Sequence, residues 1–372
     1  MSSFQPFVME RWQSMYENLV DFNLSESGVD PVTLAELLAL AGDDGGERLA
    51  PTRLGYGQSN GTEALRLRIA ELYHGAGVDD VVVCNGSAEA NFLAVWELVE
   101  AGDEVVIIVP TYMQTHGLAR SLGARVVEVP LREELGWQPD PDEIRRAVTD
   151  RTRLLVATNP GNPTGAVFSD TVRGAITEAV SRSGAWLLAD EVYTGAELDG
   201  PETPSFLGAC ERVIATGSLS KAYGLPGLRI GWAVTDRATA DALWARSDYT
   251  TISPGDLTDR LARVALDPAV RPQLLQRTRS MVRRGLDTLE EWLHARGGFH
   301  WRAPDAGAIC FVRYDADIDS ATLAERLRAE QSVLVVPGAH FGLGPYLRLS
   351  LGVEPDYMRR ALERIGTVVD GQ

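Results

Sequence analysis

The chain has 372 residues, of which 45% are apolar and 23% charged. Its length suits about two domains, and its composition excludes collagen-like, disordered and disulfide-scaffold proteins. The 52 acidic residues outnumber the 35 basic ones, and the net charge of −17 argues against nucleic acid or an anionic membrane as a partner. The three cysteines form no CxxC pair, no apolar run approaches about 18 residues, and the N-terminus lacks a signal-peptide pattern, so we expect a cytoplasmic protein without a membrane segment.

Between residues 80 and 235, short runs rich in β-branched residues alternate with longer segments of amphipathic helical spacing, such as 88–100 and 171–183. Several runs are apolar almost throughout, as expected of strands buried on both faces of a parallel sheet. This alternation predicts an α/β domain with a mostly parallel, seven-stranded sheet and flanking helices. The seven expected strands lie at 81–84, 104–110, 124–130, 153–159, 185–190, 212–217 and 230–234.

After Pro254 the pattern changes to arginine-rich helical stretches, then short strands, then a final helix that begins near Pro355. This predicts a second, smaller α+β domain. We expect residues 1–40 to complete this small domain, residues 41–265 to form the large domain, and residues 266–372 to form the C-terminal small domain. The helical stretches lie at 257–266 and 270–296, and the short strands near 308–313, 332–336 and 346–351.

Lys221 is the only lysine in the chain, so every other residue counted as Lys or Arg is an arginine. A genome bias toward arginine would explain the loss of lysine from the surface, where the two cations are nearly interchangeable. It would not explain the one lysine that remains, unless that residue survived by chance. A retained lysine indicates chemistry that arginine cannot perform: an amine that loses its proton and attacks a carbonyl.

Polar motifs follow several of the expected strands, where ligands collect in a parallel α/β sheet. Taken singly, each motif has a structural explanation, because Asn, Pro and Gly form turns and Asp or Ser caps helices. Their occurrence together, beside the only lysine, indicates a ligand site. The motifs are 85–88 (NGSA), 159–165 (NPGNPTG), 190–193 (DEVY) and 218–221 (SLSK), with Arg229 eight residues after the last one.

These motifs resemble those of the class I/II aminotransferases, the fold type I enzymes that use pyridoxal 5′-phosphate (PLP). The run at 218–232 follows the pattern SxSKxxxxxGxRxGW, and the resemblance extends from the region of Tyr56 to Arg348. It implies the α/β fold of the fold type I PLP-dependent transferases, PLP as cofactor, and small amino-acid and 2-oxo-acid substrates. PLP carries a phosphate, a pyridine ring and an aldehyde, so its site must supply anion donors, a buried carboxylate and a primary amine. The chain offers all three.

The resemblance implies three catalytic residues, Lys221, Asp190 and Tyr193. Lys221 would form the Schiff base with PLP and, once displaced by substrate, move a proton between the substrate Cα and the cofactor. Asp190 would pair with the protonated ring nitrogen, while Asn162 and Tyr193 would hydrogen-bond the ring 3-oxygen. Tyr112 would stack on the ring face.

The resemblance also implies a phosphate site at a helix N-terminus. Gly86, Ser87 and Ala88 would present free N–H groups there, where the helix dipole favours an anion. Ser218 would add a hydroxyl and Arg229 a fixed cation to the same phosphate.

Tyr56 resembles the tyrosine that reaches across a dimer to the neighbour's phosphate, so the resemblance implies a homodimer with shared active sites. Arg348 resembles the arginine that grips the substrate α-carboxylate through a bidentate fork. Together with Asn162, Ser27 and Gly28, it makes up the expected substrate-binding set. The histidines show no metal-ligand spacing, so we expect no metal site.

Two further resemblances bear on the reaction. Dicarboxylate aminotransferases bring a second arginine from the neighbouring subunit in the loop after the lysine, but the corresponding loop 248–254 has no basic residue, which argues against aspartate or glutamate specificity by that route. Segments 25–29, 248–251, 336–338 and 341–342 are similar to those of capreomycidine synthase-like enzymes, which cyclise a hydroxylated arginine by β-elimination and re-addition. Glu26 and Asp248 would serve its guanidinium, or else are merely solvated acids.

The first interpretation is therefore a PLP-dependent aminotransferase that moves an amino group between an α-amino acid and a 2-oxo acid through the Lys221 Schiff base. The alternative is a PLP-dependent lyase or cyclase that acts on a modified amino acid such as a hydroxyarginine. A third alternative is a non-catalytic binding protein, which the intact Lys221 argues against.

Overall fold

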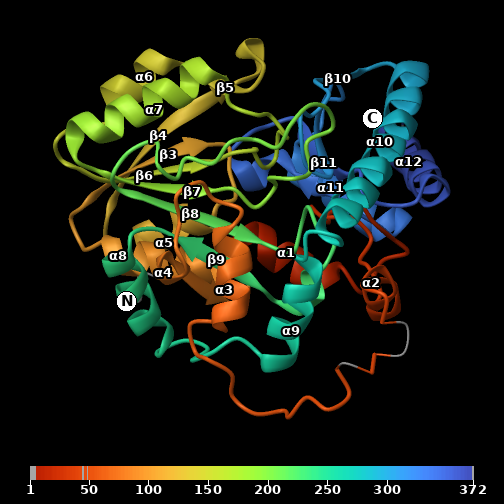
Figure 1. Cartoon of the computed structure of the whole chain (residues 1–372). Coiled ribbons are helices and arrows are strands. Elements are labelled where there is room, and N and C mark those ends of the chain that lie inside the picture. The colour runs from red at the N-terminus through yellow and green to blue at the C-terminus, as the bar shows by residue number, and fades with distance from the viewer. Residues whose placement is uncertain (1–5, 44–45, 48, 371–372) are drawn as a thin grey trace.

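The computed structural model describes residues 6–43, 46–47 and 49–370 of the chain, and Figure 1 shows their arrangement. Its largest element is an eight-stranded sheet with the spatial order β2-β9-β8-β7-β6-β3-β4-β5. The strands are β2 (Val81–Cys84), β3 (Glu104–Val109), β4 (Arg125–Arg132), β5 (Gln138–Pro139), β6 (Thr152–Thr158), β7 (Trp186–Asp190), β8 (Val213–Ser218) and β9 (Gly231–Val234).

The sheet is mostly parallel. Strands β4, β3, β6, β7 and β8 pair in parallel, whereas β9 runs antiparallel to both β2 and β8. The seven expected strands are confirmed. The eighth, β5, pairs antiparallel at the edge beside β4 and was not expected, because two residues that include a proline carry no strand pattern.

Helices cover both faces of this sheet (Figure 1). Along β3, Val105 and Ile107 point into the cluster on one face, while Val106 and Ile108 point into the cluster on the other. Burial on both faces explains why the strand sequences are apolar throughout rather than alternating. One face is covered by α4 (Ser87–Leu98), α5 (Gln114–Ser121) and α8 (Arg237–Ser247), and the other by α6 (Pro141–Ala147) and α7 (Asp170–Ser183).

The C-terminal part builds a second, four-stranded antiparallel sheet with the order β10-β11-β14-β13. Most apolar side chains of this sheet pack in one core with apolar side chains of the three C-terminal helices. The strands are β10 (Phe299–Trp301), β11 (Ile309–Tyr314), β13 (Val336–Pro337) and β14 (Tyr346–Ser350), and the helices are α10 (Arg271–Arg296), α11 (Ser320–Gln331) and α12 (Pro355–Val369).

The N-terminal segment joins this C-terminal core. Strand β1 (Phe22–Asn23) pairs in parallel with β12 (Val333–Leu334), and Phe22 is buried in the core cluster of the C-terminal part. These contacts support our proposal that residues 1–40 and 266–372 form one small domain and residues 41–265 the large one. The ends of these proposed ranges, at 1–5 and 371–372, lie outside the described residues.

The remaining helices are α1 (Val8–Tyr16), α2 (Leu34–Leu40), α3 (Glu63–Ala70) and α9 (Asp256–Ala265). Met9 of α1 belongs to the same apolar cluster as Val106 and Ile108 of the large sheet, and Trp12 Nε1 donates to Val335 O at 3.0 Å. Helix α1 therefore lies against both parts of the molecule. In the described part of the chain, no helix combines the length and the apolar character needed to cross a bilayer.

The packing of α10 against the end of β14 predicts the effect of a single methyl group. A Cβ added at Gly285 of α10 would lie 2.0 Å from the backbone oxygen of Leu351, so Gly285→Ala must displace backbone. We expect a loss of about 1–3 kcal/mol in the free energy of unfolding. The matched control is Gly174→Ala in α7, where a Cβ meets no atom within 4 Å; it should gain about 0.5–1 kcal/mol. Denaturant titration of both variants checks this, and equal stability of the two would contradict it.

Candidate active site

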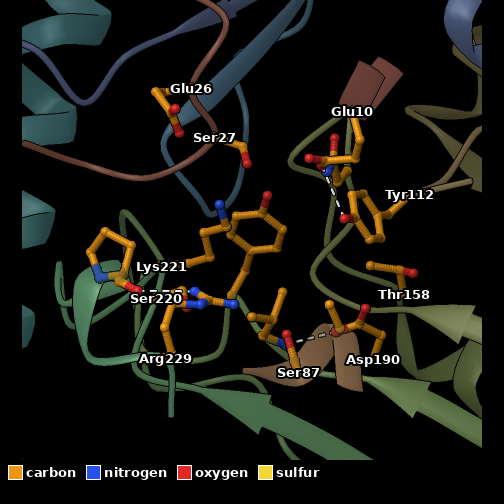
Figure 2. Close-up of a pocket in the computed structure, with 15 residues that line it drawn as sticks. Glu10, Glu26, Ser27, Ser87, Tyr112, Thr158, Asp190, Ser220, Lys221 and Arg229 are labelled. Carbon is orange, nitrogen blue, oxygen red and sulfur yellow. Dashed lines mark hydrogen bonds between the residues drawn. The ribbon is translucent and has the colours of Figure 1, made fainter. Parts of the chain in front are cut away.

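The carboxyl ends of β6, β7 and β8 face a cavity of about 260 Å³ that also borders the start of α4 (Figure 2). The parallel strands end at the same edge of the sheet, so the residues that follow them converge there. Ten of the residues considered in the sequence line the cavity: Glu26, Ser27, Ser87, Ala88, Tyr112, Asn162, Asp190, Tyr193, Lys221 and Arg229.

Lys221 follows β8, and its side chain extends into the cavity (Figure 2). Burial lowers the pKa of its amine below the ordinary value of 10.5, and the nearby Arg348 and Arg229 lower it further, while Glu26 and Glu10 oppose them. A lower pKa increases the fraction of neutral amine near neutral pH. The neutral form is the nucleophile that attacks a carbonyl.

Asp190 ends β7 and is buried at the floor of the site. Its Oδ2 accepts from Asn91 Nδ2 at 2.9 Å and its Oδ1 from Val192 N at 3.3 Å. Both partners are neutral, and no Arg or His within the described residues forms an ion pair with this carboxyl. Burial raises the pKa of Asp190, although the two hydrogen bonds and Lys221 oppose the rise. A cationic N–H placed beside it would stabilise the charged form.

Arg348, on β14, is buried beside the cavity with an incomplete set of partners. Its Nη1 donates to Asn162 Oδ1 at 3.0 Å and its Nη2 to Ser25 O at 2.5 Å, while its Nε has no acceptor among the residues that the structure describes. Among the described residues, the buried Tyr193 hydroxyl also has no hydrogen-bond partner of normal geometry, although Ser27 lies close enough to lower its pKa. Burial raises the pKa of Tyr193 to about 12, although Arg348 opposes this. The Arg348 Nε and the Tyr193 hydroxyl can therefore each form a hydrogen bond with a bound molecule.

The opposite end of the cavity is built to hold an anion. Helix α4 begins after Gly86, whose φ of 85° is one that glycine adopts freely, and its first N–H groups have no partner within the helix. A Cβ at Gly86 would lie 2.4 Å from Arg229 Nη2, so only glycine lets this cation lie against the helix N-terminus. The helix dipole and the guanidinium act together on an anion bound there.

Several expected residues lie off the cavity. Ser218 is buried at the end of β8, where its Oγ accepts from Ser220 N at 3.1 Å, and it is Ser220 that lines the cavity. Gly28 lines an adjoining cavity instead. Tyr56 is 89% exposed and does not line the cavity. Asp248 caps the C-terminus of α8 and does not line the cavity.

The sequence did not indicate Glu10 or Asn91. Glu10 belongs to α1, lines the cavity, and accepts a hydrogen bond from Tyr112 Oη at 3.0 Å; no motif marks it, so only the tertiary contact shows it. Asn91 is fully buried among apolar residues of α4. The sequence did contain a signal for Asn91, because a polar residue on the apolar face of a predicted helix indicates a buried hydrogen-bonding role.

The family model described as aminotransferase class I and II matches residues 23–365. The chain belongs to this family. It is 37% identical over 359 residues to capreomycidine synthase from Streptomyces vinaceus, covering 94% of this chain and 91% of that protein. It is 31% identical over 331 residues to an aspartate/prephenate aminotransferase from Thermus thermophilus, covering 86% and 85%. Its structure superposes on a PLP-dependent aminotransferase from Streptococcus suis with a TM-score of 0.93, at 32% identity and with 99% and 98% of the chains covered.

The match to the family model and the superposition confirm the family and the α/β fold that we expected from the sequence. They also show that the chain is a PLP-dependent enzyme. The residues around the cavity fit that cofactor. Within the described part of the chain, Asp190 forms no ion pair with an arginine or a histidine, and the Tyr193 hydroxyl has no hydrogen bond of normal geometry. Arg229 lies beside a helix N-terminus. These are the groups that a pyridinium, a ring oxygen and a phosphate would satisfy.

Glu191, next to Asp190, yields a pH-dependent prediction. This buried carboxylate accepts from Phe206 N at 2.7 Å and from Ser205 Oγ at 2.9 Å. Burial nevertheless raises its pKa from 4.5 to about 7. Between these two pH values the folded state binds more protons than the unfolded state, so the contribution of Glu191 to stability falls as the pH rises through this window.

Glu191→Gln removes this titration. We expect the melting temperature of the variant, relative to the unmodified protein, to increase between pH 4.5 and pH 8, as measured by thermal unfolding. The exposed Glu63→Gln in α3 is the control and should show no such trend. A difference for Glu191→Gln that stays constant with pH would show that this carboxyl does not titrate in that window.

Proposed function

We propose that the chain is a PLP-dependent aminotransferase that moves an amino group between an α-amino acid and a 2-oxo acid. The observation that carries this proposal is the position of the only lysine. Lys221 enters one cavity together with the buried Asp190 and close to the buried Arg348, and burial lowers the pKa of its amine. Bound PLP supplies a carbonyl that links to amines and a ring that accepts the electron pair left when a substrate Cα loses its proton.

Lys221 has two roles in this proposal. Its Nζ would attach the cofactor covalently, and its neutral amine would take the proton from the substrate Cα. The buried Asp190 carboxylate would keep the ring nitrogen protonated, because each of the two opposite charges favours the charged form of the other. Tyr193 and Asn162 would hold the ring 3-oxygen, and Tyr112, which lines the same cavity, would stack on the ring.

Two arginines hold the anionic ends of the bound molecules. Arg229 and the amides of Ser87 and Ala88 would bind the cofactor phosphate, with hydroxyls from the segment 218–220. The N–H of Gly86, expected there from the sequence, instead donates to Cys84 O at 2.9 Å. Arg348 binds the substrate α-carboxylate; its unpartnered Nε and its contact with Asn162 support this role. Ser27 lines the same cavity and adds a hydroxyl beside the carboxylate position.

The second candidate is a PLP-dependent lyase or cyclase, and two observations favour it. The segment 25–29, which resembles capreomycidine synthase-like enzymes, borders this active site: Glu26 and Ser27 line the cavity and Gly28 the adjoining one. The 37% identity to a capreomycidine synthase supports the same reading. The cofactor-binding residues suit both reactions, so the products must distinguish them.

The products of a complete turnover test the proposal. An aminotransferase releases the 2-oxo acid of its substrate and transfers a ¹⁵N label from the amino acid to a second 2-oxo acid, which mass spectrometry detects. Lys221→Ala should lower the rate at least about a thousandfold, and Lys221→Arg, which keeps the charge but not a nucleophilic amine, should be equally inactive. Borohydride reduction of the holoenzyme should label one peptide only. Ammonia release or a cyclic product would favour the second candidate, and a label on another peptide would contradict the role of Lys221.

We also propose that the enzyme works as a cytoplasmic homodimer with shared active sites. Tyr56 and Tyr249 are 89% and 80% exposed, and Tyr56 forms an isolated bridge with Gly255, so their two segments lie side by side. The loop that follows Tyr249 is anchored at the start of α4, where Asn85 Nδ2 donates to Thr251 Oγ1 at 2.7 Å. Two exposed tyrosines, one of them on a loop anchored next to the phosphate end of the site, suit contact with a partner chain.

Hybrid dimers test this arrangement. If Tyr56 serves the partner's phosphate site, Tyr56→Phe should weaken PLP retention. Mixing Tyr56→Phe with Lys221→Ala subunits should give hybrids in which one site carries both changes and the other carries neither. Activity should therefore return in about half of the sites of those hybrids. A monomer with full activity in light scattering, or hybrids without recovered activity, would show that each site is built from one chain.

A further inference from the structure

The face of α4 that packs on the large sheet carries a buried amide, that of Asn91. The helix packs across β7, β8 and β9, and the neighbours of Asn91 on this face, Ala90, Ala94 and Val95, are apolar and fully buried. Only 1% of Asn91 is exposed. An amide in such surroundings costs free energy unless hydrogen bonds compensate its burial, so its partners indicate what it does there.

Both polar atoms of this amide have a partner. The Thr216 hydroxyl on β8 donates to Asn91 Oδ1 at 2.8 Å, and Asn91 Nδ2 donates to Asp190 Oδ2 on β7 at 2.9 Å. Thr216 is itself fully buried. The three side chains form a chain of hydrogen bonds, here called the Thr216–Asn91–Asp190 relay, in which every donor points toward the carboxylate. Each bond polarises the next, so the relay stabilises the negative charge of Asp190 more than a single amide would.

The orientation of the amide fits an ionised Asp190. With the amide reversed, Asn91 Oδ1 would face Asp190 Oδ2, and two acceptors would meet without a proton between them. The observed orientation instead places an N–H against the carboxylate and leaves the amide oxygen to accept from Thr216. Burial raises the pKa of Asp190, and the hydrogen bond from Asn91 is the largest effect that opposes this rise.

A neutral donor leaves the charge of Asp190 available to the cofactor. An arginine or histidine would neutralise the carboxylate, but none within the described residues forms an ion pair with it. The other titratable groups that interact with Asp190 are Lys221, Glu191, Tyr73, Tyr112 and Tyr193. Of these only Lys221 can be cationic, and in the proposed function it is attached to the cofactor. The amide of Asn91 and the backbone N–H of Val192 then hold the charge of this carboxylate.

We propose that Asn91 is a positioning residue for the reaction, and that the Thr216–Asn91–Asp190 relay keeps the proton shared by Asp190 and the cofactor ring nitrogen on the nitrogen. The inference rests on the proposed function, because it needs bound PLP with its ring nitrogen beside Asp190. The pair exists either as carboxylate and pyridinium or as carboxylic acid and neutral pyridine. A donor on Asp190 Oδ2 stabilises the first form more than the second, and the protonated ring is the better electron acceptor.

The position of this proton can be measured directly. ¹⁵N NMR of the holoenzyme loaded with PLP labelled at the ring nitrogen distinguishes pyridinium from neutral pyridine, independently of turnover. Asn91→Leu replaces the amide by an apolar group of similar size and should move the signal toward that of neutral pyridine at constant pH. Loss of a hydrogen bond to a charged group should change the ratio of the two forms by about tenfold or more. The kcat for amino transfer should fall, whereas the KM for the amino acid should change little.

Thr216→Val tests the relay separately, and it keeps the inference testable if Asn91→Leu does not fold. It removes the hydroxyl but keeps the branched shape, and it should move the signal in the same direction by a smaller amount. Added to Asn91→Leu it should have no further effect, because it acts through Asn91. The matched control is Thr278→Val in α10, a buried threonine whose hydroxyl has no hydrogen-bond partner in the described part of the chain; it should leave the signal unchanged.

Four outcomes separate the inference from the proposed function. A signal that neither Asn91→Leu nor Thr216→Val moves would overturn the inference, and amino transfer by the unmodified enzyme would still support the proposed function. A full effect of Thr216→Val beside Asn91→Leu would overturn the relay. A neutral ring nitrogen in the unmodified holoenzyme would overturn both the inference and the role proposed for Asp190. The expected signals without any amino transfer would overturn the proposed function alone.

Discussion

Parallel pairing of β6, β7 and β8 is the constraint on which the rest of the site depends. Their carboxyl ends meet at one edge, so the residues at or after these ends, Asn162, Asp190 and Lys221, face a common cavity although about 30 residues separate each from the next in the chain. β9 returns antiparallel to β8, and the turn between these two strands carries Arg229 to the start of α4. The amine, the carboxylate and the anion site thus come from the topology of one sheet.

The site also depends on buried charged groups whose hydrogen-bonding or ion-pairing capacity the protein leaves partly unused. Asp190 has only neutral partners, and Arg348 has one nitrogen without an acceptor. Such groups cost free energy in the protein alone. A bound molecule that supplies the missing charge or hydrogen bond recovers that cost, so the same features that reduce stability favour binding of the cofactor and the substrate.

The N-terminal segment completes the site from outside the large sheet. Helix α1 lies against both parts of the molecule, and β1 pairs with β12. This path places Glu10, Glu26 and Ser27 over the cavity floor formed by the sheet. The cofactor end of the cavity is therefore fixed by the large sheet, whereas the substrate end depends on how the segment 6–32 and Arg348 pack against it.

The sequence by itself determined the seven long strands, their mostly parallel sheet, the family and the residues at the strand ends, because these features leave local patterns: apolar runs, turn motifs and one lysine. Tertiary structure alone decided which of these residues share a cavity. It placed Ser220 rather than Ser218 on the cavity wall, and it placed Asp248 away from the cavity. It also brought Glu10 against Tyr112, a contact between residues 102 positions apart. No local pattern encodes such a contact, because it arises only when two separate elements pack together.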